Sequence, residues 1–366
     1  MGGIWGKNII LSIFGESHGS GIGLVIDGLP PGLSLDLDLI NKELQRRAPG
    51  RDKLSSQRRE EDEFEILSGY FNSRTTGTPL CGIIRNKDSK PEDYKELKDI
   101  IRPGHGDYPG YIKYKGFNDY RGGGHFSGRL TAPIVFAGAI AKQVLMKKNI
   151  LIGSHIKRIF NIEDRIFNKS YISENLLREI ANKDFPVIED TQGKKMKEVI
   201  ANIKNEKDSV GGEIETAILN IPPGLGQPFF HSIESRLSQM MFSIPSVKAI
   251  EFGSGFDMAR AKGSQVKDEY IIEGDQIKTI ENHNGGITGG ISNGMPIVFN
   301  IGIKPTPSIG QVQRTVNIKE MKEIEINIRG RHDPCILPRT VPVVEGGTAL
   351  VILDLLIEME GRSWMS

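Results

Sequence analysis

Apolar residues along the chain follow two repeating patterns, and together they predict a mixed fold of strands and helices. Strand-like runs cover residues 8–14, 21–27, 80–86, 213–221 and 297–303. Helical spacing of apolar residues covers 36–47 and 232–242, and a more polar helix is expected at 171–182. Two longer segments, 132–147 and 343–357, carry wide apolar faces, which is typical of helices packed on sheets. We therefore expect an α/β or α+β fold.

A short pattern occurs twice in the chain. Each of the strand-like runs 21–27 and 213–221 leads into a Pro-Pro-Gly turn, at 30–32 and 222–224, and each turn precedes a predicted helix. Two weaker pairs of similar segments, 77–80 with 294–297 and 129–140 with 339–350, follow in the same order. Collinear repeats of this kind predict one duplicated unit rather than two independent domains.

The expected organisation is thus a single domain over residues 1–366. Its half-repeats cover about 8–150 and 210–357. A polar stretch at about 161–209 is expected to lie at the periphery, outside both half-repeats.

Charge and cysteine content exclude several classes of protein. Lys and Arg number 47 and Asp and Glu 46, so the net charge of +1 provides no general attraction for nucleic acid or an anionic membrane. Cys81 and Cys335 are too few for a disulfide scaffold or a four-thiolate zinc site. We see neither a signal peptide nor an apolar run of 18 residues, and we expect a cytoplasmic protein with no membrane or nucleic-acid partner.

Three glycine-rich segments place imidazole or guanidinium groups on irregular loops. They are residues 15–19 with His18, 102–107 with Arg102 and His105, and 121–129, which leads into a predicted helix. Backbone N–H groups at a helix start attract anions, so the third segment is a candidate phosphate cradle. An RNA-binding Arg-Gly tract is the competing interpretation, but it occurs only once and lacks interleaved aromatic residues.

Two further segments bear charged groups of a kind used in binding sites. Basic residues dominate 42–59, including Arg47 and Lys53, and either bind an anion or form a solvated face balanced by the acidic residues 60–63. Residues 330–335 bring Arg331, His332 and Asp333 together. Adjacent His and Asp side chains usually diverge, so we expect no metal there.

These segments resemble chorismate synthase over nearly the whole chain. The resemblance is carried by residues 15–19, 27–32, 124–131 and 331–335. It implies a β-α-β sandwich with internal pseudo-twofold symmetry and a homotetramer. The activity it implies is an anti-1,4-elimination of phosphate from 5-enolpyruvylshikimate 3-phosphate to give chorismate, with reduced FMN and no net redox change.

The resemblance also implies roles for individual residues. His18 would protonate the departing phosphate, His105 would adjust flavin protonation, and Asp333 would assist removal of the C6 proton. The implied substrate-binding residues are Ser17, Arg47, Lys53, Arg102, Arg129 and Arg331. The implied flavin-binding residues are His125, Phe126, Ser127, Pro245, Ser246, Gly289, Lys304, Pro305, Thr306, Pro307, Ser308 and Arg331.

The chain departs from the family pattern at two of these places. Lys53 stands where the family often has Arg, and a lysine keeps the charge but loses the bidentate fork. Residues 125–128 also differ from the commoner motif, so the side chains that touch FMN there are less well defined.

Two questions stay open at this point. No dinucleotide-binding fingerprint is visible, so the chain either reduces flavin through a cryptic NADPH site or depends on an external reductase. The alternative function is a non-catalytic phosphate- or RNA-binding module.

Overall fold

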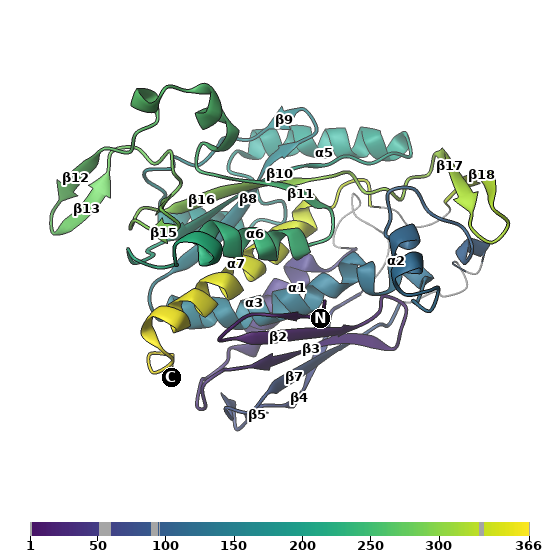
Figure 1. The fold of residues 1–366 in the computed structure, drawn as a ribbon, viewed down its shortest axis with the longest axis horizontal. Helices are drawn as coiled ribbons and strands as arrows, with labels where there is room; N and C mark the ends of the chain where they lie inside the picture. Colours follow the sequence, from purple (N-terminus) through teal and green to yellow (C-terminus); the bar gives the residue numbers. More distant parts are fainter. Residues whose placement is uncertain (1, 51–59, 89–93, 95, 329–332, 366) are drawn as a thin grey trace.

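The computed structural model describes residues 2–50, 60–88, 94, 96–328 and 333–365. Within these residues, two five-stranded sheets form the outer layers and long helices lie between them (Figure 1). Across the first sheet the strands are β1 (Ile4–Trp5), β2 (Ile10–Gly15), β3 (Gly21–Asp27), β7 (Leu80–Arg85) and β4 (Phe64–Ser68). Across the second they are β11 (Val247–Phe252), β16 (Ile297–Ile303), β10 (Gly212–Leu219), β8 (Leu151–Ile159) and β9 (Ile162–Glu163).

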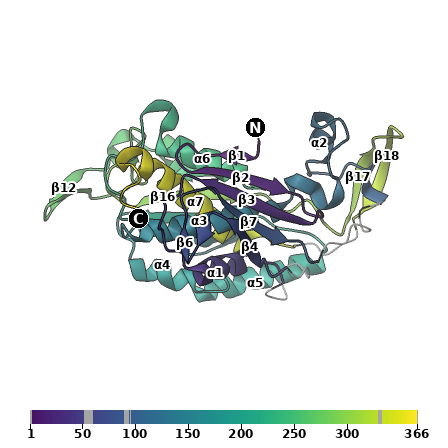
Figure 2. The ribbon, with the colours of Figure 1, turned by 90° about the horizontal axis from the view of Figure 1, so that it is seen from below.

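Neighbouring strands in both sheets run antiparallel. The helices of the middle layer are α1 (Leu37–Arg47), α3 (Thr131–Met146), α6 (Ile233–Ser243) and α7 (Leu337–Glu360). Seen from below, the first sheet lies across α3 and α7 (Figure 2). The predicted α+β sandwich is therefore confirmed.

The remaining elements are small or peripheral. They are the strands β5 (Tyr70–Phe71), β6 (Arg74–Thr75), β12 (Tyr270–Glu273), β13 (Gln276–Thr279), β14 (Ile287–Thr288), β15 (Ile291–Ser292), β17 (Val312–Asn317) and β18 (Lys322–Asn327), and the helices α2 (Asp107–Lys113), α4 (Glu174–Ala181) and α5 (Asp190–Asn205). The hairpins β12–β13 and β17–β18 project from opposite ends of the molecule (Figure 1).

Local sequence signals explain where the shorter central helices begin. Asp36 caps α1 by accepting a hydrogen bond from the amide of Leu39 at 3.0 Å, and Ser232 caps α6 by accepting one from Ser235 at 3.1 Å. A cap of this kind stabilises a helix by about 1 kcal/mol. Helix α7 instead begins six residues before the predicted start and runs through Pro342. The free energy gained by burying its first turns offsets the loss of the hydrogen bond that proline cannot make.

The two Pro-Pro-Gly turns are held by the same three hydrogen bonds. The hydroxyl of Thr75 donates to Pro30 and accepts from Leu33, while the Thr75 carbonyl accepts from Gly32. Ser292 makes the corresponding bonds to Pro222, Leu225 and Gly224 in the other half.

Strand order matches between the halves as well. The order β2-β3-β7-β4 in one sheet corresponds to β8-β10-β16-β11 in the other, with α1 and α3 corresponding to α6 and α7. These matches support the duplication. The bounds of the half-repeats stay a prediction, and β8 as the counterpart of β2 would place the second start before residue 210.

The polar stretch 161–209 is more firmly attached to the body than the sequence indicates. Its helices α4 and α5 bury Leu177, Ile180 and Met196. The expected helix at 171–182 is confirmed in the shorter form of α4, and its apolar side faces the second sheet rather than solvent.

A buried histidine also ties this stretch to the second sheet. His155 of β8 bonds Asp164 through Nδ1 at 3.0 Å and Glu215 of β10 through Nε2 at 2.9 Å. The same carboxylates accept backbone N–H groups of Phe167, Ile188 and Glu189. We refer to His155, Asp164 and Glu215 as the His155 triad.

Two helical segments are long and apolar enough to cross a membrane, contrary to the expectation that the sequence lacks such a run. They are residues 121–146, which include α3, and α7, and their apolar windows are 83% and 100% buried. Both are core helices of the sandwich. Their apolar character is explained by burial, because α3 contacts strands of both sheets and α7 contacts the second sheet and the neighbouring helices.

Candidate active site

Residues 16–20 connect β2 to β3, and we call this segment the His18 turn. Ser17 and His18 are both buried, and the amide of Ser17 donates to the carbonyl of Gly124 at 3.2 Å. The imidazole packs edge-on against Tyr94, with 4.8 Å between ring centroids. A Cβ atom on Gly122 would lie 2.2 Å from that imidazole, so only glycine allows this approach.

The glycine segment that faces His18 has an unusual backbone. Gly122, Gly123 and Gly124 have φ angles of 59°, 85° and 53° within the 3₁₀ turn η2 (Arg121–Phe126). Residues that carry a Cβ atom rarely adopt positive φ, so this backbone geometry requires the sequence Gly-Gly-Gly. The turn places Gly122 against the imidazole of His18 and lies shortly before α3 in the chain.

Arg47 and Arg129 share one buried carboxylate. Arg47 at the end of α1 bonds one oxygen of Asp62, with its Nε at 2.9 Å, and Arg129 of the 3₁₀ turn η3 (Gly128–Leu130) bonds the other. All three side chains are at most 4% exposed. The sequence offered an anion site or a solvated face. Around Arg47, the described residues form a buried ion-pair network rather than a solvated face, and we call this network the Asp62 cluster. The anion site stays a prediction.

Burial and charge act in opposite directions on this cluster. Burial lowers the pKa of Arg47 to about 10, although Asp62 favours the charged form. Burial alone would raise the pKa of Asp62, but the guanidinium groups of Arg47 and Arg129 hold it below its usual value. The carboxylate is therefore ionised and keeps two like charges close together.

The loop 102–107 meets residues 304–308 across the two halves of the chain. Arg102 is buried and forms a bidentate pair with Asp107, at 2.7 and 2.8 Å. His105 bonds the hydroxyl of Ser308 through Nε2 at 2.9 Å, and Lys304 donates to the carbonyl of Gly104 at 2.8 Å. The guanidinium of Arg102 also lies 5.9 Å from the ring of Tyr94, which contacts His18.

Asp333 contacts the segment 304–308 and is held by the first turns of α7. Arg339 Nη1 pairs with a carboxylate oxygen of Asp333 at 2.6 Å, and its Nε donates to the carbonyl of Arg47 at 3.1 Å. Thr306 donates to the carbonyl of Asp333 at 2.8 Å. Asp333 is thus connected to both the Asp62 cluster and the segment 304–308.

Most of the predicted flavin-binding residues lie near these groups. His125 bonds the Gly15 carbonyl at 2.9 Å, and Phe126 packs over Gly106 and Gly110. The backbone amide of Lys304 bonds the carbonyl of Ser246, the residue after Pro245. Pro305 lies against Gly211, Pro307 against Gly104, and Ser127 caps η3.

Gly289 is the exception within the described chain. It lies between β14 and β15, next to Gly290, whose carbonyl accepts the amide of Ile233 at the start of α6. Pro245 and Ser246 follow the other end of that helix. The structure therefore does not bring Gly289 together with the other residues.

Two of the predicted residues, Lys53 and Arg331, lie outside the described residues. Conversely, the structure identifies three groups that the sequence did not single out: Asp62, Asn86 and Arg339. Asp62 appeared only as part of an acidic run. Neither spacing nor motif indicated that Asn86 and Arg339 contact site residues.

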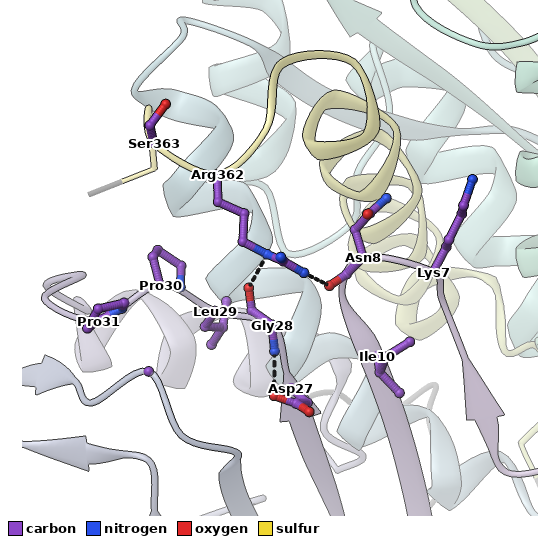
Figure 3. A pocket seen from close by; sticks show the side chains of 11 residues that line it. Lys7, Asn8, Ile10, Asp27, Gly28, Leu29, Pro30, Pro31, Arg362 and Ser363 are labelled. Atoms are coloured by element: carbon purple, nitrogen blue, oxygen red, sulfur yellow. Dashed lines mark hydrogen bonds between the residues drawn. The ribbon is translucent and has the colours of Figure 1, made fainter.

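Two hollows lie at different places on the described part of the surface. A narrow cavity of about 60 Å³ adjoins the site, since Arg102, Gly123 and Phe126 are among its lining residues. A wider hollow of about 520 Å³ lies at the first Pro-Pro-Gly turn (Figure 3). Arg362 crosses it to donate to the carbonyls of Gly28 and Asn8, and no predicted site residue lines it. The convergence of charged groups, rather than hollow size, therefore marks the candidate site.

No group of three or more His, Cys, Asp or Glu side chains that could hold a metal ion occurs among the residues that the structure describes. Besides the paired carboxylates of Asp62, Asp107 and Asp333, the site is built from arginine, histidine, lysine and backbone amide groups. Such donors bind phosphate and carboxylate groups.

Comparison with known proteins gives one consistent result. The family model of chorismate synthase matches residues 9–357. Chorismate synthase of Pyrococcus abyssi is 48% identical over 96% of this chain and 97% of its own length, and that of Prochlorococcus marinus is 43% identical over 99% of both. A crystal structure of chorismate synthase superposes with a TM-score of 0.77, at 31% identity, covering 98% of this chain and 94% of the other. With its sandwich fold and its clustered arginine and histidine residues, this chain belongs to the chorismate synthase family.

Proposed function

We propose that this chain converts 5-enolpyruvylshikimate 3-phosphate to chorismate and inorganic phosphate by a 1,4-elimination. The observation that carries the proposal is the connected arrangement of Arg47, Arg102 and Arg129 with His18 and Asp333. These residues come from segments far apart in the sequence. Their convergence is expected of an active site and is not required by packing alone.

The charge of the substrate fits the three described arginines. The substrate carries one phosphate and two carboxylates, and each guanidinium has five N–H donors in a fixed fork. The carboxylates of Asp62 and Asp107 use only part of this capacity. We propose that Arg47, Arg102 and Arg129 contact the substrate anions, together with Ser17, Lys53 and Arg331.

Two protons have to move in the reaction, and the site has groups for both. The C3–O bond breaks with departure of phosphate, and we assign His18 as the acid that protonates it. The C6–H bond breaks on the other side of the substrate, and we assign Asp333 as the group that assists removal of that proton. Arg339 holds the Asp333 carboxylate in place.

The residues around His105 fit a reduced flavin. The exposed ring of Phe126 is flanked by Gly106 and Gly110, and the ammonium group of Lys304, the hydroxyl of Ser308 and the glycine turn 122–124 lie nearby. Together they offer an apolar surface for a flat ring and donors for a phosphate. Reduced FMN, when bound, supplies electron density that helps the C3–O bond to break.

We propose that the residues of this region hold that flavin, namely His125, Phe126, Ser127, Pro245, Ser246, Lys304, Pro305, Thr306, Pro307 and Ser308, with Arg331. His105, fixed by Ser308, would hold or release a proton at the flavin. Gly289 is included only on the family resemblance.

The proposed assembly is a homotetramer in the cytoplasm. Phe229 and Phe230 are 86% and 90% exposed, and Ile272 on the β12–β13 hairpin is 82% exposed. Exposed apolar groups of this size support association with other subunits.

A phosphate- or RNA-binding module without catalysis is the second candidate. It would place its arginines along an open groove. Arg47, Arg102 and Arg129 are instead buried and paired. No observation here favours this candidate.

An anaerobic assay of the purified chain with reduced FMN and the substrate tests the proposal. We expect chorismate and phosphate to appear in equal amounts, with no net consumption of reduced flavin. Binding of the substrate without release of phosphate would contradict the proposed function and favour a binding module.

A further inference from the structure

Asn86 follows β7 and contacts both the His18 turn and Arg129. Its side-chain Nδ2 donates to the carbonyl of Glu16 and to the carbonyl of Gly19, each at 2.9 Å. Its Oδ1 accepts from Nε of Arg129 at 3.0 Å. The backbone amide of Asn86 also donates to Ser20 at 3.3 Å.

The orientation of this side-chain amide is fixed by chemistry. Backbone carbonyls only accept hydrogen bonds, and the Nε of arginine only donates. If oxygen and nitrogen were exchanged, all three bonds would be lost. The side chain of Asn86 therefore has one orientation that satisfies its neighbours.

The two carbonyls it binds stand on either side of Ser17 and His18. Asn86 follows the neighbouring strand β7, and its side-chain amide thus connects the two ends of the turn that carries the imidazole. On its other side it holds a guanidinium that is also fixed by Asp62.

We propose that Asn86 is a positioning residue that holds the His18 turn in register with Arg129. In this role it fixes the acid relative to the arginine that binds the substrate. The role rests on the proposed function, because it is defined by the reaction that His18 and Arg129 perform.

The variant Asn86→Asp separates the contact with the His18 turn from the contact with Arg129. It keeps the size and the acceptor for Arg129, but it replaces the donor by an oxygen that repels both carbonyls. We expect kcat to fall by about 10–100-fold, since a small displacement of a catalytic group has effects of this size, while KM changes less than about threefold. In Asn86→Ala, which also loses the acceptor for Arg129, kcat should fall and KM should rise.

Asn282→Asp is a matched control. The Nδ2 of Asn282 likewise donates to two carbonyls, those of Lys169 and Pro296, and its Oδ1 accepts the amide of Gly286. This variant loses the same kind of bonds in the other half of the chain. Its thermal stability should fall without the drop in kcat that Asn86→Asp shows.

A double-variant comparison tests whether Asn86 acts through His18. If it does, adding Asn86→Asp to His18→Ala should change kcat less than about twofold, because the acid is already absent. Independent losses that multiply would overturn the proposal. Equal loss of kcat in Asn86→Asp and Asn282→Asp would also overturn it, since this would indicate a general loss of structure.

NMR of the wild-type protein keeps the proposal testable if the variants do not fold or if the enzyme proves inactive. Both side-chain N–H protons of Asn86 should be protected from exchange with solvent, and the His18 ring signal should move in Asn86→Asp but not in Asn282→Asp. Rapid exchange of those protons in the wild-type protein would overturn the link to the turn. Absence of chorismate formation in the wild-type protein would contradict the proposed function alone.

Discussion

Gly138 of α3 lies against Gly346 of α7, so closely that a Cβ atom on Gly138 would fall 2.2 Å from the Cα of Gly346. The reverse contact is looser, because a Cβ on Gly346 would meet its nearest neighbour, the carbonyl oxygen of Ile134, at 3.3 Å. The close approach of these two helices thus depends on one glycine more than on the other.

This difference predicts unequal effects of two similar substitutions. Gly138→Ala should lower the free energy of unfolding by about 2–3 kcal/mol, because the helices have to move apart. Gly346→Ala should be nearly neutral, since the higher helix propensity of alanine offsets the tight contact. Urea denaturation of both variants measures this, and equal losses would contradict the assigned packing.

Removing the shared carboxylate of the Asp62 cluster should expose the repulsion between its arginines. Asp62→Asn leaves two buried guanidinium groups without their counter-charge, and we expect stability to fall by up to about 5 kcal/mol. Inorganic phosphate should then raise the melting temperature of this variant more than that of the wild-type protein, because an anion replaces the carboxylate.

Two observations check this expectation. Glu63→Gln, which removes an exposed partner of Lys87, should leave stability nearly unchanged. Because the pKa of Asp62 is lowered in the folded protein, its contribution is present above the unfolded value and is lost as pH falls through the folded one. Identical acid denaturation of the wild-type protein and Asp62→Asn would count against the cluster.

The His155 triad predicts the opposite dependence on pH. Burial would lower the pKa of His155, but its hydrogen bonds to Asp164 and Glu215 raise it above the ordinary value of 6.5. Its stabilising contribution is therefore complete below about 6.5 and is lost as pH rises through the folded pKa. In His155→Gln, the unfolding free energy should no longer fall as pH rises through this range. His231→Gln replaces an exposed histidine, so that variant should lose stability with rising pH as the wild-type protein does. Unfolding free energies measured from pH 6 to 9 decide between them.

His18→Ala tests the proposed acid. We expect turnover to fall by about 10²–10⁴-fold, the range found for a positioned acid or base, while flavin affinity changes little. Anaerobic turnover and a flavin titration measure the two quantities, with His231→Ala as the control. A parallel loss of flavin binding would give His18 a structural role instead.

Asp333→Asn tests the proposed base in the same assay. The amide keeps the size of the side chain and an acceptor for Arg339, but it removes the basic site, so substrate and flavin should bind while turnover collapses. Normal elimination by this variant would exclude the assigned role.

The sequence predicts the fold better than it predicts the site network. Strands such as β3 and β16 and the caps Asp36 and Ser232 follow from local patterns, because neighbouring residues determine them. The start of α7 does not, since Pro342 indicates a break that is overcome only by burial of Leu337 and Val341. Burial of this kind depends on tertiary packing.

The same distinction applies to the site. His18 and Arg102 could be predicted because glycine-rich segments mark the loops that carry them. Asp62 and Asn86 look like ordinary polar residues, and their role arises from partners far away in sequence. The pairing of Arg47 with Asp62 is buried, and spacing along the chain cannot distinguish a buried ion pair from a solvated one.

The bonds that assemble the site also determine when it can form during folding. Arg339 and Arg47 are 292 residues apart in the chain, and His105 and Ser308 are 203 apart. Contacts with such large separations require closure of long loops and are expected to form slowly. A chain emerging from the ribosome would carry His18 long before its partners exist. Phosphate affinity should consequently appear only in the last phase of refolding, after both sheets have closed over the helices.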